Sequence, residues 1–259
     1  MAGPLDNLPD RDSASLPEGR FCRYEFKYLL PRGLAAPIRA FVTSHLPHDR
    51  HSEIAPDHTY RISSLYLDSD DLRLCRESLS GQKNRIKLRI RCYDDELDNP
   101  VYLEIKRRLN TVILKDRCPI SRDDLEAYTE AVPIGPESAT AAQFRFYRAY
   151  LAARPQALVR YRREAFEGRG PSRVRITLDR DIQCLPTSDW QVKLGGPGWR
   201  RVIDRDFVLE IKFNGRYPAW LQTLVRTFQL KARSVSKYTL SLTDGLPAAG
   251  GLFATRRIN

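Results

Sequence analysis

Cationic and apolar residues alternate one by one along most of the extended segments of this chain. In residues 84–93, Lys87, Arg89 and Arg91 occupy every second position, and mainly apolar residues fill the positions between them. Because side chains on a β-strand point alternately to opposite faces, such a strand has one charged face and one apolar face. The alternation recurs in residues 23–28, 103–106, 113–117, 159–162, 173–179 and 209–212.

Two arrangements of such strands are open. One is an ordinary antiparallel sheet with a solvated face, but Arg and Lys dominate the polar positions here and repel one another. In the other arrangement, helices cover the apolar faces of the strands. The sequence predicts helices with apolar stripes over 31–46, 69–79, 138–153 and 218–230, and another that begins at Ser121. If these helices cover the apolar strand faces, the charged faces point inward. We therefore predict an α+β fold, a closed antiparallel β-barrel of about eight strands with flanking helices.

A charged interior of this kind indicates a polyanionic ligand, because unpaired buried charge is very costly. The whole chain has 43 Lys and Arg against 32 Asp and Glu, a net charge of +11. Glu25, Glu104 and Glu210 lie on the same strand faces as the cations, where they can pair with cations or hold a divalent metal through oxygen. Binding and activation of a nucleoside triphosphate or polyphosphate would need such a combination of many cations and a few carboxylates.

Segments spread along residues 20–243 resemble a known family. They are, in order, RFCRYEFKYLLP, SLYLDSDDLRLCRESL, KLRIRCYD, VYLEIKRR, LVRYRREAF, VRITLDRDI, VLEIKFNGRYPAWL and SVSKYTLSL. The set resembles the VTC domain, a polyphosphate polymerase domain of the triphosphate tunnel metalloenzyme superfamily. The resemblance implies a tunnel-shaped barrel and a Mn²⁺- or Mg²⁺-dependent enzyme that moves the γ-phosphoryl group of ATP onto inorganic polyphosphate.

The resemblance also implies roles for individual residues. It assigns catalysis to Arg89, Arg91 and Lys237, and metal binding to Glu210, to which the strand pattern adds Glu25 or Glu104 as a further metal ligand. The register leaves open whether Arg160 or Arg163 matches the family's arginine before the A-F dipeptide. The expected substrate-binding residues, to which the strand pattern adds Lys87 and Lys212, are Lys27, Lys87, Arg89, Arg91, Lys106, Lys115, Arg160, Arg163, Arg175, Lys212, Ser236 and Lys237.

Two other function classes stay open beside a polymerase. One is a tunnel hydrolase or cyclase acting on tripolyphosphate or ATP, and the other is a non-catalytic module that binds polyphosphate or RNA by charge. The expected partners are ATP and inorganic polyphosphate or triphosphate, with no specific nucleic acid. A membrane partner would have to be another protein, because no apolar run approaches the roughly 20 residues that span a bilayer.

The sequence predicts a leader over 1–19, one domain over 20–244 and a tail over 245–259. The cysteines are scattered and odd in number, which favours reduced thiols in a cytoplasmic protein and no zinc site. All histidines fall in residues 45–58, which we interpret as a solvated helix end and loop rather than a metal site. Asp68 precedes a predicted helix and is better explained by capping than by metal binding.

Overall fold

The structure is a computed structural model that describes residues 23–110, 112–128, 137–169 and 173–243. The predicted leader and tail lie outside these residues. The strands are β1 (Arg23–Pro31), β2 (Tyr60–Asp68), β3 (Arg85–Cys92), β4 (Val101–Leu109), β5 (Val112–Ile120), β6 (Arg154–Glu167), β7 (Arg175–Pro186), β8 (Arg200–Arg201) and β9 (Asp206–Asn214). The helices are α1 (Ala35–Thr43), α2 (Arg50–Ile54), α3 (Arg73–Leu79), α4 (Ala139–Tyr150), α5 (Ala219–Thr227) and α6 (Lys237–Thr243), with 3-10 helices at Arg32–Leu34 and Asp123–Tyr128.

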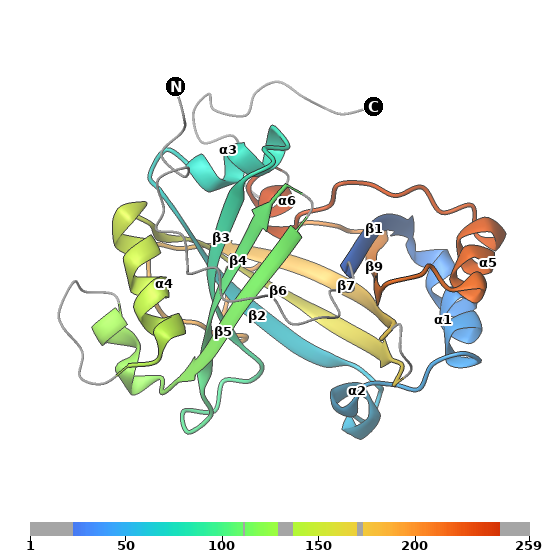
Figure 1. Ribbon diagram of the computed structural model, residues 1–259. Coiled ribbons are helices and arrows are strands. Elements are labelled where there is room, and N and C mark those ends of the chain that lie inside the picture. The colour runs from blue at the N-terminus through green and yellow to red at the C-terminus, as the bar shows by residue number, and fades with distance from the viewer. Residues whose placement is uncertain (1–22, 111, 129–136, 170–172, 244–259) are drawn as a thin grey trace.

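The strands form one curled antiparallel sheet in the order β1-β9-β7-β6-β2-β3-β4-β5 (Figure 1). The short β8 pairs with β7. The prediction of an antiparallel sheet with flanking helices is confirmed. The predicted closure is not found, since no ladder joins β1 to β5 within the described residues. The sheet is a half-barrel in which β4, next to one edge, is linked to the opposite edge strand β1 across the interior, where Lys106 Nζ lies 3.1 Å from Glu25 Oε1. Alternation predicts where a side chain points, and it carries no information on whether the outermost strands pair.

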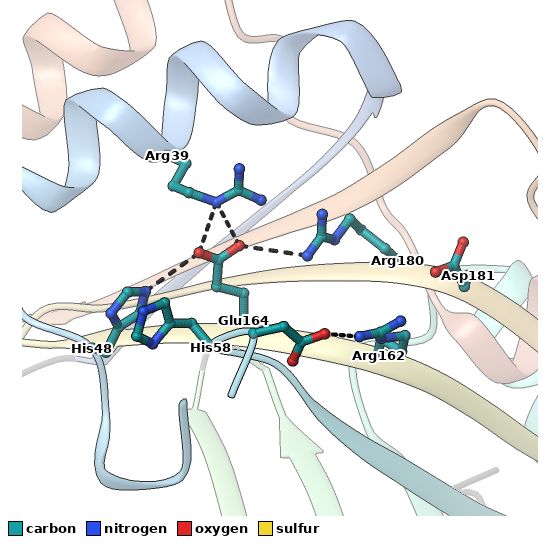
Figure 2. A pocket seen from close by; sticks show the side chains of 8 residues that line it. Arg39, His48, His58, Arg162, Glu164, Arg180 and Asp181 are labelled. Atoms are coloured by element: carbon teal, nitrogen blue, oxygen red, sulfur yellow. Dashed lines mark hydrogen bonds and ion pairs between the residues drawn. The ribbon is translucent and has the colours of Figure 1, made fainter. Parts of the chain in front are cut away.

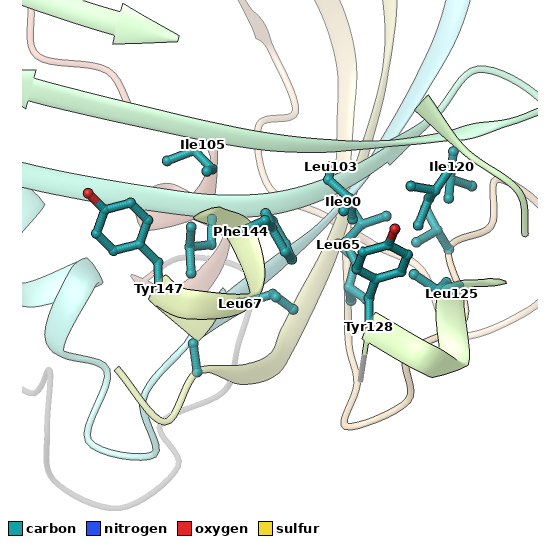
Figure 3. Close-up of a cluster of buried hydrophobic side chains, with 14 of the residues drawn as sticks. Leu65, Leu67, Ile90, Leu103, Ile105, Ile120, Leu125, Tyr128, Phe144 and Tyr147 are labelled. Carbon is teal, nitrogen blue, oxygen red and sulfur yellow. The ribbon is translucent and has the colours of Figure 1, made fainter. Parts of the chain in front are cut away.

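Apolar strand faces point outward under the helices, as predicted. One cluster lies between α4 and strands β2 to β5, where Phe144 and Tyr147 of α4 pack against residues such as Leu65, Leu67 and Ile105 (Figure 3). A second cluster joins α1 and α5 to the outer faces of β1, β7 and β9. Burial of these two apolar faces is the main stabilising contribution to the curled sheet.

The predicted helices are found in shortened form. Ser138 caps α4 by accepting a hydrogen bond from the Ala141 amide at 3.2 Å. The helix expected at Ser121 is only the short 3-10 helix at Asp123–Tyr128. Two helices were not predicted, α2 and α6, which are 5 and 7 residues long.

The α6 helix packs inside the curl, against the interior faces of β6 and β7. Val159, Tyr161 and other apolar residues of these strands form a third cluster with it. The interior is therefore apolar at the α6 end, which was not expected. It also follows that Arg160 and Arg162, which alternate with Val159 and Tyr161, lie on the outer face of β6.

Asp68, at the end of β2, holds α6 in place. Its fully buried carboxylate accepts hydrogen bonds from the Leu74 amide at 2.8 Å, the Cys75 amide at 2.9 Å and the Tyr238 hydroxyl at 2.8 Å. The first two bonds cap α3, as the sequence predicts for this residue. The third connects β2 directly to α6.

We expect Asp68→Ala to lower the free energy of unfolding by about 3 kcal/mol or more, because it leaves several buried donors without an acceptor. Urea denaturation measures the change. The matched control is Asp70→Ala, which removes an exposed carboxylate nearby and should cost less than about 0.5 kcal/mol. Equal losses in the two variants would contradict the role given to Asp68.

Candidate functional site

Strands β1 and β9 bring opposite charges together at one side of the interior. Glu25 pairs with Lys212 in the ladder, and Lys27 pairs with Glu210. The four side chains form a checkerboard, with Lys27 Nζ 2.9 Å from Glu25 Oε1 and Lys212 Nζ 3.0 Å from Glu210 Oε1. Burial opposes ionisation of Glu210, but Lys212 and Lys27 hold its pKa well below the ordinary value. Both glutamates therefore remain charged.

A buried carboxylate organises the opposite wall, built from β3, β4 and β5. Glu104 is almost fully buried, and Arg89 Nε donates to its Oε2 at 2.6 Å. Lys115 Nζ lies 3.0 Å from Glu104 Oε1, and Arg91 and Arg117 each lie 3.7 Å from the same oxygen. Burial alone would raise the pKa of Glu104, but Arg89 and Arg91 hold it far below the ordinary value.

Asp179 of β7 anchors a third group of cations. Arg163 donates from Nε and Nη2 to its two carboxylate oxygens at 2.6 and 2.8 Å, and Lys237 Nζ lies 2.6 Å away. The carboxylate is fully buried, yet Arg163 and Lys237 lower its pKa to about 2. Arg163 also approaches Glu210 to within 4.0 Å, which links this group to the β1–β9 checkerboard.

A row of three lysines crosses the same wall without alternating charge. Lys87, Lys106 and Lys115 stand directly opposite one another on β3, β4 and β5. No carboxylate described in the structure forms an ion pair with Lys87, which instead donates to Ser236 Oγ at 2.8 Å. Burial and the nearby Lys27 lower the pKa of Lys87 to about 7 and that of Lys106 to about 8. These shifts indicate an excess of positive charge.

We call the charged residues that meet in this space the interior cation cluster. Its cations are Lys27, Lys87, Arg89, Arg91, Lys106, Lys115, Arg117, Arg163, Lys212 and Lys237. Its carboxylates, which they outnumber by more than two to one, are Glu25, Glu104, Asp179 and Glu210. The surplus fits a polyanion, because rigid Arg and Lys donors are already oriented toward a shared space.

Most of the residues singled out in the sequence meet in this cluster. Arg175 lies beside it, opposite Lys212 in the β7–β9 ladder, and bonds to Asp49 at 2.7 Å and to Glu167. Of the two arginines with ambiguous register, the structure brings Arg163 into the cluster. Arg160 lies on the outer face, 4.1 Å above the ring centre of Trp199.

Two members of the cluster were not among the expected site residues. Asp179 and Arg117 both belong to alternating segments of the sequence, so the signal that could have identified them was present. Two tyrosines accompany the arginines, Tyr161, which the alternation assigned to the apolar face, and Tyr66, which lies outside the alternating segments. Tyr66 accepts a hydrogen bond from Arg89 at 3.1 Å.

The carboxylates differ in their suitability for a metal ion. Glu104 is surrounded by Arg89, Arg91, Lys115 and Arg117, so a cation would meet strong repulsion there. Glu25 and Glu210 lie close enough that each raises the cost of ionising the other. Within the described ranges no group of three or more His, Cys, Asp or Glu side chains could hold a metal. A pair of carboxylates fits Mg²⁺ or Mn²⁺ only if phosphate oxygens complete the coordination.

A pocket of about 490 Å³ on the outer face of β6 and β7 provides a contrast (Figure 2). Buried Glu164 accepts from Arg39 at 2.8 Å and lies 3.7 Å from Arg180, while Arg162 pairs with Asp57. Each of these arginines thus has a carboxylate partner, whereas Lys87 of the interior has none among the described residues. His48 and His58 stack beside Glu164, so the histidine segment is packed here and is not only a solvated loop.

The described chain contains no helix of the length and apolar character that a bilayer crossing requires. The cysteines at 75, 92, 118 and 184 are free and buried.

Comparison with known proteins identifies relatives. The chain is 24% identical to vacuolar transporter chaperone complex subunit 4 of Schizosaccharomyces pombe, in a match covering 82% of this chain and 36% of that protein. The chain thus spans about a third of the length of this curated relative.

Two solved structures are similar with TM-scores below one half. A candidate adenylate cyclase from Bacillus halodurans has a TM-score of 0.47 at 14% identity, covering 83% of this chain and 95% of that one. The PH1819 protein from Pyrococcus horikoshii has a TM-score of 0.42 at 16% identity, covering 85% and 98%.

A family model for the VTC domain matches residues 22–243. The match includes every strand that contributes to the interior cation cluster. Because it covers most of the chain, the protein belongs to the VTC domain family.

Proposed function

We propose that the interior cation cluster binds the triphosphate of ATP and inorganic polyphosphate, and that it transfers the γ-phosphoryl group of ATP to the end of the polyphosphate chain. The observation that carries the proposal is the row formed by Lys87, Lys106 and Lys115, which concentrates positive charge beyond what nearby carboxylates can offset. Membership of the VTC domain family, and the name of the S. pombe relative, support a polyphosphate-related role.

The proposed reaction needs no nucleophilic side chain. A terminal oxygen of polyphosphate forms a bond to the γ-phosphorus, the bond from that phosphorus to the bridging oxygen breaks, and ADP leaves. Negative charge spreads over the transferring group, and fixed donors such as Arg89, Arg91 and Arg163 stabilise it without reorganising. Glu104 and Asp179 act indirectly, because their ion pairs hold these guanidinium groups in place.

Glu25 and Glu210 would hold Mn²⁺ or Mg²⁺ together with phosphate oxygens. When bound, the ion would neutralise part of the phosphate charge. Glu104 is assigned instead to positioning Arg89 and Arg91, since its oxygens already face four cations.

The first test compares two arginines of the same strand. We expect Arg163→Gln to lower the rate of polyphosphate synthesis from ATP and Mn²⁺ by about 100-fold or more, because it removes a donor to the reacting phosphates. The matched control, Arg160→Gln, changes the outer face of β6 and should retain the wild-type rate. Products are separated on a polyphosphate gel.

The product pattern decides among the function classes. Chains from the wild type support the polymerase. Free phosphate without chains would contradict it and identify a hydrolase, and saturable binding without turnover would identify a binding module. Equal activity of Arg163→Gln and Arg160→Gln would contradict the assignment of the site.

A second prediction concerns the cost of the surplus charge. Lys87→Met should weaken tripolyphosphate binding by about tenfold and also stabilise the ligand-free protein by about 1 kcal/mol. The pKa of Lys87 lies below its ordinary value of 10.5, so the cost of its charge is fully present below pH 7 and declines as the pH rises toward 10.5. The gain in stability should therefore be larger at pH 6 than at pH 9.

Calorimetric titration and thermal unfolding measure these two effects. Lys231→Met, which removes the charge of an exposed lysine, is the control and should change both values little. A loss of stability in Lys87→Met would show that its charge is offset by a group other than the proposed ligand.

A third prediction concerns protons. Burial and the nearby Lys27 lower the pKa of Lys87 to about 7 and that of Lys106 to about 8, so both amines lose their protons at a lower pH than an ordinary lysine does. A bound polyanion favours the charged amines and raises their pKa values, so binding of a non-hydrolysable ATP analogue should take up protons, and affinity should fall from pH 7 to pH 9. Titrations in buffers of different ionisation enthalpy measure the uptake. Proton release, or an uptake unchanged in Lys87→Met, would contradict the interpretation.

A further inference from the structure

A second pair of like charges lies on the interior face of β3 and β4. Arg85 stands directly opposite Arg108, one row beyond Lys87 and Lys106 and next to the β4–β5 turn. Like charges in this position destabilise a sheet unless another group offsets them. Successive rows on one face of a strand are about 6.8 Å apart, so the pair continues the lysine row toward the sheet end.

The local partners of these arginines are neutral. Arg85 Nη1 donates to the Gln82 carbonyl at 2.7 Å, and Arg108 Nε donates to the Asn110 carbonyl at 2.8 Å. Neither arginine forms an ion pair with a carboxylate of the described chain. Burial and the facing Arg108 lower the pKa of Arg85, which agrees with positive charge that is not locally offset. Among the described residues, Arg85 and Arg108 use one guanidinium nitrogen each in a hydrogen bond.

The chain treats a similar pair differently elsewhere. Arg162 and Arg180 also stand directly opposite each other, on the outer face of β6 and β7. There Arg162 pairs with Asp57, and Arg180 lies 3.7 Å from Glu164. Opposed arginines are thus accompanied by acids on the outer face, whereas no acid among the described residues pairs with Arg85 or Arg108.

We propose that Arg85 and Arg108 form an additional phosphate subsite, which binds the part of a polyphosphate chain that extends beyond the interior cation cluster. The proposal rests on the proposed function, and it adds a preference for chains longer than a triphosphate. Each planar guanidinium can bind phosphate oxygens through two parallel hydrogen bonds. A triphosphate held at the lysine row leaves this outer row free, and a longer chain reaches it.

The test compares two probes, tripolyphosphate and size-fractionated polyphosphate of tens of phosphates, by calorimetric titration. The double variant Arg85→Gln/Arg108→Gln should weaken long-chain binding by about tenfold or more and change tripolyphosphate binding by less than about twofold. It should also flatten the salt dependence of long-chain binding, because fewer ions are released. Arg85→Lys/Arg108→Lys keeps the charge and should retain most of the long-chain affinity.

The matched control is Arg162→Gln/Arg180→Gln, which removes the same charge from the outer face, and thermal unfolding verifies that every variant folds. The subsite is overturned if long-chain affinity falls no further than in this control, or if tripolyphosphate affinity falls by the same factor. If wild-type protein binds neither probe, the proposed function fails and the subsite fails with it. If the wild type binds tripolyphosphate but the Arg85→Gln/Arg108→Gln variant keeps the wild-type affinity for long chains, the subsite is overturned and the proposed function is not.

Discussion

Mutual repulsion among the cations of the interior is the constraint to which the rest of this structure responds. The carboxylates Glu25, Glu104, Asp179 and Glu210 each touch at least two cations and offset part of that repulsion. In the lysine row they pair with Lys106 and Lys115, and none of the described carboxylates pairs with Lys87. The free energy needed to gather these charges is therefore supplied during folding, so a polyanion meets donors that are already in position.

The stabilising free energy comes from the other side of the sheet. Apolar strand faces pack under α4 on one flank and under α1 and α5 on the other, and this packing holds the curl against the repulsion within it. The α6 helix is the exception, because it sits inside the curl and brings Ser236 and Lys237 to the site. It is held there by the hydrogen bond from Tyr238 to Asp68 and by the apolar cluster that it forms with β6 and β7.

The sequence predicted much of this from a period of two. It placed apolar faces outward and identified most of the cluster, because alternation alone determines which residues of a strand share a face. The prediction of the inward face failed on β6. The alternation placed Arg160 and Arg162 inward, but the interior beside α6 is apolar, so Tyr161 faces it and Arg162 faces outward. The sequence also could not predict that β1 and β5 do not pair with each other, or that α6 enters the curl. Both features depend on contacts between residues far apart in the chain.

Strand β6 separates two charged environments, with Arg163 facing the interior cluster and Glu164 facing the outer pocket. A shift of one residue along this strand would exchange them, so single insertions or deletions here should be far less tolerated than substitutions. The same property affects how distant relatives are compared. Because arginines occur on both faces, aligning them by residue type can be wrong by one position, and the buried Tyr161 and Ala165 are the safer markers of the interior face.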